Sequence, residues 1–133
     1  MLSSFTECKE CLEDRQLAVL PTETVYGLAA NGIERYAVEK IFKTKGRPAG
    51  NPLILHIFDI TEADKLAEVN DMARLLARRF WPGPLTIILP KKKIVPSEVS
   101  ASLNTVGLRS PSNYLFRKML YELGFPLAAP SAN

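Results

Sequence analysis

The sequence predicts an α/β protein (α+β in some classifications) in which helices cover both faces of one mixed β-sheet. Short apolar runs typical of strands alternate with segments whose apolar residues recur at helical spacing, and short loops join them. Two neighbouring pairs of predicted strands, within residues 17–31 and 85–109, are separated by too little chain for a helical crossover. These connections indicate a mixed sheet rather than a purely parallel one.

The first half of the chain carries start and stop signals for its elements. Ser4 and Glu7 have the spacing of a capping box, and Gly46 is a natural C-terminal stop for a helix. Pro48 and Pro52 keep the residues around them extended, because a residue that precedes proline avoids the helical region. The expected elements are a helix over residues 5–14, strands over 17–20 and within 22–31, a helix over 34–46, and a strand buried on both faces over 52–58.

In the second half, polar caps and prolines separate the expected elements. Thr61 and Asn70 are the expected N-caps of two helices, and Ser110 followed by Pro111 opens a third that Gly124 closes. The expected elements are helices over residues 61–68, 70–80 and 111–123, strands over 85–89, 105–109 and 126–130, and a surface loop over 90–99. The side chains of the second of these helices that are expected to face inward are Met72, Leu75, Leu76 and Phe80.

Length and composition limit the classes of protein to which the chain can belong. With 133 residues, 47% of them hydrophobic and 23% charged, the chain suits one soluble globular domain. No apolar run approaches the roughly 20 residues of a membrane span, and the N-terminus does not resemble a secretory signal. A cytoplasmic protein without a membrane partner is therefore expected. The net charge of +3 permits an anionic ligand but does not require nucleic acid.

The two cysteines, Cys8 and Cys11, form an isolated C-x-x-C pair inside the first predicted helix. A zinc site would need a second pair or histidines, and the one histidine, His56, is far away in the sequence. We interpret the cysteines as small residues on a helix face, and no metal ligands are assigned.

Cations and an amide gather where the second helix ends and the next strand begins. Lys45 and Arg47 lie two residues apart on a backbone expected to be extended, so their side chains leave on the same face. Arginine offers a planar fork for phosphate or carboxylate, lysine adds a point charge, and Asn51 contributes a directional amide. The segment predicts an anion site, and the alternative is that the cations only complement a helix C-terminus.

Further polar side chains follow or interrupt the predicted strands. Residues 22–24 place two hydroxyls and a carboxylate after a buried strand, although turn formation alone also explains them. His56 lies within an apolar strand, as a ligand contact or as a satisfied core residue. Arg109 ends the strand TVGLR, where burial is costly without an anion or an acid. Residues 130–133, PSAN, put a hydroxyl and an amide after the last strand.

The motifs that are missing also narrow the function. The chain has no Walker-type phosphate loop, no G-x-G-x-x-G, no paired-histidine metal motif, and no obvious nucleophile with its base. Cations, amides and hydroxyls suit the binding and electrostatic stabilisation of phosphates better than covalent catalysis.

Five motifs, taken in order, resemble those of the YrdC-like family of threonylcarbamoyl-AMP synthases. They are PTETVYGLAAN, KTKGRPAGNPLILHI, FWPGPLTIIL, TVGLRSP and LAAPSAN, and the resemblance extends over residues 17–133. The family hallmark is a lysine-x-arginine with a later serine-x-asparagine, which are here residues 45–47 and 131–133.

The resemblance implies a YrdC/RibB-like fold, a twisted mixed sheet with helices on both faces and a positively charged concave pocket. It implies a nucleotidyltransferase that converts ATP, bicarbonate and L-threonine into threonylcarbamoyl-AMP and pyrophosphate, with Mg²⁺ accompanying the ATP. A protein complex would then pass the threonylcarbamoyl group to tRNA, and the family's basic face suggests that tRNA or double-stranded RNA binds directly.

The resemblance also assigns roles to residues of this chain. Lys45 and Arg47 are the expected catalytic residues. The expected ATP-binding residues are Lys45, Arg47, Asn51, Thr105, Ser131 and Asn133. The expected threonine-binding residues are Thr24, His56, Arg109 and the backbone of Ala129.

Family members continue beyond the SAN motif, on whose last residue this chain stops. The expectation is one YrdC-like domain over residues 1–133 that lacks the usual C-terminal part, as a fragment or as a naturally short protein. Two other functions stay open. One is a non-catalytic module that binds structured RNA. The other is a carbamoyl-adenylate domain of hydrogenase maturation, which normally belongs to a larger chain with zinc-finger-like cysteine motifs.

Overall fold

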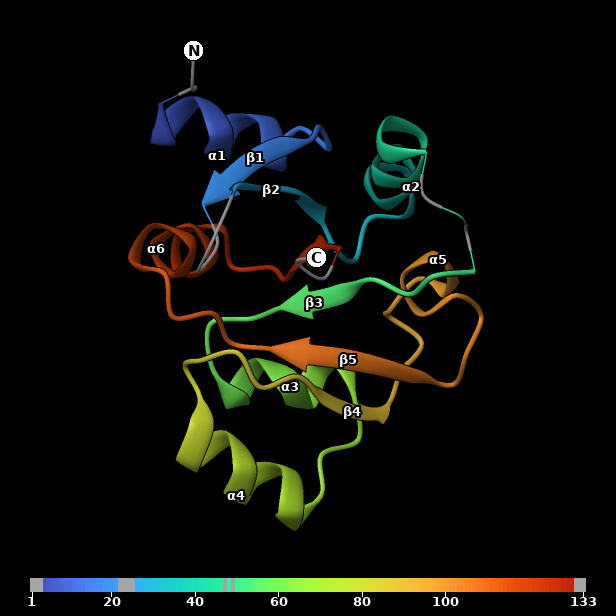
Figure 1. The fold of residues 1–133 in the computed structure, drawn as a ribbon, viewed down its shortest axis with the longest axis vertical. Coiled ribbons are helices and arrows are strands. Elements are labelled where there is room, and N and C mark those ends of the chain that lie inside the picture. Colours follow the sequence, from blue (N-terminus) through green and yellow to red (C-terminus); the bar gives the residue numbers. More distant parts are fainter. Residues whose placement is uncertain (1–3, 22–25, 47, 49, 131–133) are drawn as a thin grey trace.

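The computed structural model describes residues 4–21, 26–46, 48 and 50–130, and these residues form a mixed β-sheet with helices on both faces (Figure 1). The strands are β1 (Ala18–Pro21), β2 (Tyr26–Asn31), β3 (Ile54–His56), β4 (Ile87–Pro90), β5 (Thr105–Arg109) and β6 (Leu127–Ala129). The helices are α1 (Phe5–Glu13), α2 (Arg35–Lys45), α3 (Ile60–Leu66), α4 (Asp71–Phe80), α5 (Ser97–Ser100) and α6 (Tyr114–Leu123). The predicted α/β fold is confirmed.

The strand order is β1-β2-β6-β3-β5-β4, and the pairing confirms a mixed sheet. In the described residues β3 and β5 are parallel, while the other neighbouring strands are antiparallel. The antiparallel pairs β1–β2 and β4–β5 are the two connections that have too little chain for a long crossover. The parallel pair in the middle brings the carboxyl ends of β3 and β5 to the same edge of the sheet.

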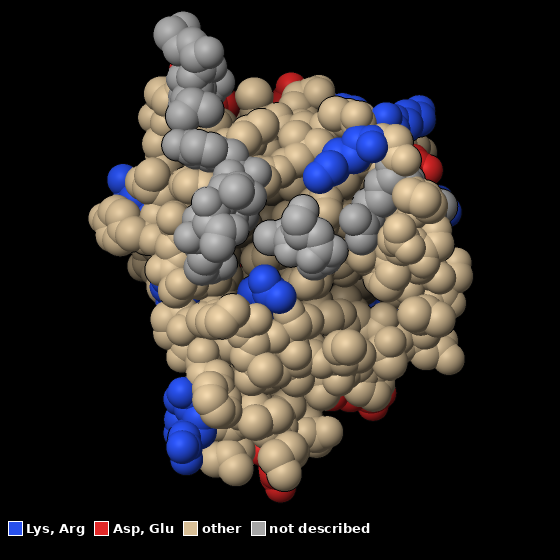
Figure 2. Space-filling view, in the orientation of Figure 1, with Lys and Arg blue, Asp and Glu red and all other residues tan. Residues whose placement is uncertain are grey.

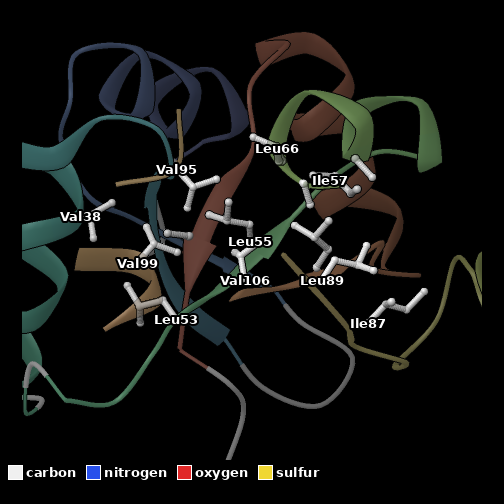
Figure 3. Close-up of a cluster of buried hydrophobic side chains, with 14 of the residues drawn as sticks. Val38, Leu53, Leu55, Ile57, Leu66, Ile87, Leu89, Val95, Val99 and Val106 are labelled. Carbon is white, nitrogen blue, oxygen red and sulfur yellow. The ribbon is translucent and has the colours of Figure 1, made fainter. Parts of the chain in front are cut away.

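Two apolar clusters lie on opposite faces of the sheet. The larger cluster packs α2, α3, α4 and α5 against one face, with the fully buried Leu55 near its centre (Figure 3). The smaller cluster packs α1 and α6 against the other face, around Leu12, Phe116 and Leu127. Along β5, for example, Val106 and Leu108 are buried in the larger cluster, and the alternation of a strand turns Thr105, Gly107 and Arg109 to the opposite face.

Several local signals act as the sequence predicts. The Ser4 hydroxyl accepts a hydrogen bond from the Glu7 amide at 3.2 Å, and the Glu7 carboxylate accepts one from the Ser4 amide at 2.9 Å. These bonds also hold the pKa of Glu7 below its ordinary value. Gly46 ends α2 in the left-handed conformation, with φ 62°. Both cysteines are free thiols in α1, Cys8 buried and Cys11 exposed, and burial raises the pKa of Cys8.

Two predicted helix starts are wrong by a few residues. α3 is capped by Asp59, whose carboxylate accepts a hydrogen bond from the Thr61 amide, so Thr61 already lies inside the helix. α6 begins after Asn113, because the Ser110 hydroxyl instead donates to the backbone oxygen of Phe58 at 2.7 Å. At α3 the stronger cap residue Asp59 stands near Thr61, whereas at α6 the Ser110 hydroxyl is engaged by Phe58 and Asn113 caps the helix.

The predicted inward face of α4 is also wrong. Met72, Leu75 and Phe80 are about half exposed or more, while Ala73 and Ala77 are the buried residues. The helix packs closely through these small side chains and leaves its larger apolar side chains at the surface. Of the four residues expected to face inward, only Leu76 packs against the core.

Two segments are organised differently from their predictions. The strand expected over residues 52–58 is limited to β3, and Ile54 is only partly buried because one face of the sheet is open there. The segment expected to be a surface loop over residues 90–99 begins in β4 and contains the start of α5. Its Val95 and Val99 are buried in the larger cluster. Among the described helices, none combines the length and apolarity that crossing a membrane requires.

We predict that Gly32→Ala destabilises the protein by about 1–3 kcal/mol, because overpacking a filled site costs energy of this order. A Cβ atom at position 32 would lie 2.4 Å from Leu55 Cδ2 and 3.2 Å from the Ala128 nitrogen. Gly50→Ala is the matched control, since its Cβ would meet no atom within 4 Å. Urea unfolding of both variants checks the prediction, and equal stability of the two would contradict it.

Candidate functional site

The α1/α6 face of the sheet is covered over only part of its width. α1 and α6 pack on the side chains of β1, β2 and β6, and in Figure 1 no described helix crosses in front of β3, β5 and β4. On this side β4 exposes Ile88, with 68% of its surface accessible, and β5 exposes Thr105 and half-buries Gly107 and Arg109. We call the uncovered surface of β3, β5 and β4 the open face.

Arg109 is the charged residue at the carboxyl end of this face. Its guanidinium donates from Nε and Nη2 to the Thr86 hydroxyl, at 2.9 Å and 2.6 Å. Among the residues that the structure describes, no acidic side chain forms an ion pair with Arg109. A half-buried cation without an acid is a favourable position for an anionic ligand, because the ligand restores the lost solvation.

His56 lies beside Arg109 in the parallel pairing of β3 and β5. Its side chain is 6% exposed, and its ring lies 5.0 Å from the Phe116 ring of α6, centre to centre. The residue therefore stands at the border between the covered part of the sheet and the open face. Its packing is that of a core residue, and its position beside Arg109 is that of a residue next to the candidate site.

Gly107 gives the open face a flat centre. The strand register places it between Ile54 of β3 and Ile88 of β4. A Cβ atom there would lie 3.1 Å from the Thr86 methyl group and 3.9 Å from Ile54 Cγ1. A glycine inside a strand often marks a place where a ligand or another backbone comes close. Neither Gly107 nor Thr86 was predicted as a site residue, although a glycine inside the strand TVGLR indicates a place of close approach.

Two of the described residues assigned to ATP, Asn51 and Thr105, lie towards the amino ends of β3 and β5. Lys45 is the exposed last residue of α2, Asn51 is exposed shortly before β3, and Thr105 is the exposed first residue of β5. Lys45 therefore also has the position of a cation that complements a helix C-terminus. Ala129 is buried on β6 and pairs with Ile54, between the two ends.

The face drawn in Figure 2 carries Lys and Arg side chains near its middle, whereas the Asp and Glu side chains seen there lie towards its edges.

Four residues assigned by the resemblance lie outside the described residues. They are Thr24, Arg47, Ser131 and Asn133. The structure thus brings His56, Arg109 and Ala129 onto the neighbouring strands β3, β5 and β6, with Ala129 under the covered part of the sheet. Asn51 and Thr105 lie at the amino ends of β3 and β5, and Lys45 ends α2.

An ion pair joins α2 to α5, the helix that contacts the segment before β3. Arg35 Nε of α2 lies 2.9 Å from Glu98 Oε2 of α5. The hydrogen bond from Arg35 holds the pKa of the Glu98 carboxyl below its ordinary value. The Leu53 amide donates to the Val99 oxygen at 2.8 Å, so α5 supports the chain just before β3.

Residues 10–133 match the model of the Sua5/YciO/YrdC family, whose description is "Telomere recombination". The chain is 47% identical over 123 residues to a threonylcarbamoyl-AMP synthase of Pyrococcus abyssi, and 47% identical over 124 residues to one of Bacillus subtilis. Each match covers 92% of this chain but 36% of the relative, so the chain spans about a third of the length of these relatives.

The fold is also similar to that of a solved structure, and again this chain spans only part of the other protein. The crystal structure of Pyrococcus abyssi Sua5 complexed with L-threonine superposes with a TM-score of 0.92 at 45% sequence identity. That match covers 97% of this chain and 38% of the other.

We predict that Glu98→Gln destabilises the protein at pH 7 by up to about 1 kcal/mol, as expected for an ion pair near the surface whose arginine is exposed. A lowered folded-state pKa gives stability that is present above the ordinary carboxyl pKa and is lost as the pH falls through the folded value. The difference between wild type and variant in urea unfolding should therefore decrease at pH values below the ordinary carboxyl pKa. A difference that persists there would contradict the assignment.

We predict that Thr86→Val destabilises the protein by about 1–2 kcal/mol, because the half-buried Arg109 loses its hydrogen-bond acceptor. Thr86→Ser keeps the hydroxyl and should retain most of the stability. Chemical denaturation of both variants measures this, and an equal loss in the two would show that the methyl group, not the hydroxyl, matters.

Proposed function

The chain belongs to the Sua5/YciO/YrdC family, and we propose that it carries the substrate site of a threonylcarbamoyl-AMP synthase. Such an enzyme makes threonylcarbamoyl-AMP and pyrophosphate from L-threonine, bicarbonate and ATP. The main support is the 47% identity to proteins of that name, over nearly the whole of this chain. The half-buried Arg109, which has no acidic partner among the described residues, provides an independent reason to expect an anionic substrate.

In this proposal, threonine binds at the carboxyl end of the open face. Arg109 pairs with the threonine carboxylate, and Thr86 keeps the guanidinium in place through its two hydrogen bonds. His56 and Thr24 complete this end of the site, and the backbone of Ala129 lies beside the amino acid. The small Gly107 leaves room for the ligand to lie against the sheet.

ATP takes the other end, so that its α-phosphate points towards the threonine amine. Lys45 and Arg47 hold the phosphates, and Asn51, Thr105, Ser131 and Asn133 complete the nucleotide contacts. The amine nitrogen adds to the carbon of carbon dioxide derived from bicarbonate and loses a proton, which gives a carbamate. A carbamate oxygen then attacks the α-phosphorus, and the bond to the leaving pyrophosphate breaks. The cations stabilise the negative charge that develops on the phosphates.

Mg²⁺ accompanies ATP in this proposal. Within the described part of the chain, no group of three or more His, Cys, Asp or Glu side chains could hold a metal ion. Such a surface fits a metal that is bound mainly through substrate phosphates, which is the usual arrangement for Mg²⁺. The ion would supply charge neutralisation at the phosphates, next to the cations of Lys45 and Arg47.

The proposal extends to the setting of the reaction. We propose a cytoplasmic protein whose product passes to a protein complex that transfers the threonylcarbamoyl group to tRNA. These partners follow from the proposed product.

We predict that Arg109→Gln weakens L-threonine binding at least about tenfold, because a charge-assisted, forked contact to the carboxylate is lost. Arg79→Gln is the matched control, since Arg79 is an exposed cation of α4 away from the open face. Calorimetry of the 133-residue chain with L-threonine, alone and with ATP, checks this.

Pyrophosphate release should depend on the presence of threonine. Threonine-independent release, or threonine binding that survives Arg109→Gln unchanged, would contradict the proposed site. The amino acid selectivity provides a further check, because no other amino acid should reproduce the binding of threonine.

A further inference from the structure

Two pockets open next to each other at the carboxyl ends of β3 and β5, between α4 and α6. The arrowheads of both strands point to this side in Figure 1. The first pocket has a volume of about 400 Å³ and the second about 450 Å³, and they share Phe58 and Arg117 as a common wall. None of the described residues assigned to the proposed substrate site lines either pocket. We call the two pockets together the α4/α6 groove.

Aromatic rings form much of the groove. Tyr114 and Tyr121 lie two turns apart on α6 and are 76% and 71% exposed. The ring of Phe58 lies 5.2 Å from that of Tyr121. In the neighbouring pocket the Trp81 ring is fixed, because its Nε1 donates to the Leu85 oxygen at 2.8 Å. Exposed rings next to base-sized hollows are suited to stacking.

The cations Arg78, Arg117 and Lys118 line the groove beside these rings. Arg117 lies 4.5 Å from the centre of the Phe58 ring, and its Nη1 donates to Ser110 Oγ at 2.8 Å. The Lys118 ammonium lies 4.6 Å from the centre of the Phe5 ring. Arg78 is exposed and forms no ion pair among the described residues.

The acidic residues of the groove are engaged elsewhere. Asp59 caps α3 through the Thr61 amide, and Glu122 lies 3.8 Å from the Lys9 ammonium. The fourth cation of the groove, Arg74, pairs with Asp64, with 2.6 Å between Nη2 and Oδ1. Among the described residues, the groove cations left without an acidic partner are therefore Arg78, Arg117 and Lys118.

We propose that the α4/α6 groove binds a single-stranded polynucleotide. Unstacked bases lie against Tyr114, Tyr121 and the rings of the two pockets, and the phosphates between them meet the cations. Base–aromatic stacking combined with a basic track is the usual recognition of single strands. A duplex cannot offer its base faces to these rings. The site goes beyond the proposed function and shares no residue with it.

The test is the fluorescence anisotropy of a labelled oligouridine of about 12 nucleotides, a length that one such module can cover. RNA and DNA of the same sequence, and a matched duplex, are the three arms. We expect Tyr114→Ala combined with Tyr121→Ala to weaken binding at least about thirtyfold, because two stacking contacts are lost. Tyr36→Ala, which removes a 64% exposed ring from α2, is the control and should change nothing. Thermal unfolding confirms that each variant is folded.

Salt dependence provides a second readout. With three cations at phosphates, the logarithm of affinity should fall with a slope of about −2 against the logarithm of salt concentration, and Arg78→Gln should reduce that slope by about 0.7. Unchanged affinity in the double tyrosine variant, equally tight binding of duplex, or equal competition by polyglutamate would overturn the proposal. Loss of binding in Arg109→Gln would also overturn it, because the oligonucleotide would then occupy the open face.

Discussion

The Arg109 guanidinium lies half-buried at the end of β5, where a charge is kept only if its hydrogen bonds and counter-charge are provided. The Thr86 hydroxyl accepts the hydrogen bonds of the guanidinium, because the antiparallel pairing of β4 and β5 brings Thr86 beside Arg109. Among the described residues, no acidic side chain provides the counter-charge. We propose that a carboxylate ligand provides this counter-charge.

The open face exists because the helices on that side cover only part of the sheet. α1 and α6 pack over β1, β2 and β6, and His56 marks their limit by packing against Phe116. The opposite face is closed by α2, α3, α4 and α5, so the strands stay rigid while one surface remains accessible. At the amino end of that surface, α5 supports the approach to β3 through the bond between Leu53 and Val99. When the opposite face of a sheet is packed against helices, side chains on its free face are positioned more accurately than side chains on loops.

Much of this organisation could be predicted from the sequence, because it depends on local signals. The β5 bounds, the capping box at Ser4 and the stop at Gly46 follow from short patterns. The failures at α4 and at Thr86 share a cause, because tertiary packing decides those positions. The apolar spacing of α4 did not reveal that Ala73 and Ala77 allow the closest approach to the core. Thr86 and the α4/α6 groove were missed because their partners come from elements far apart in the sequence.

The central claim is that the Arg109 guanidinium binds the carboxylate of an amino acid on the open face. The most direct measurement is nuclear magnetic resonance of arginine side-chain nitrogens during a titration with L-threonine. The account predicts that the Arg109 Nε resonance shifts and sharpens as the ligand binds, while that of Arg78 in the α4/α6 groove does not move. A threonine titration that leaves Arg109 unchanged, or that shifts Arg78 instead, would contradict the account.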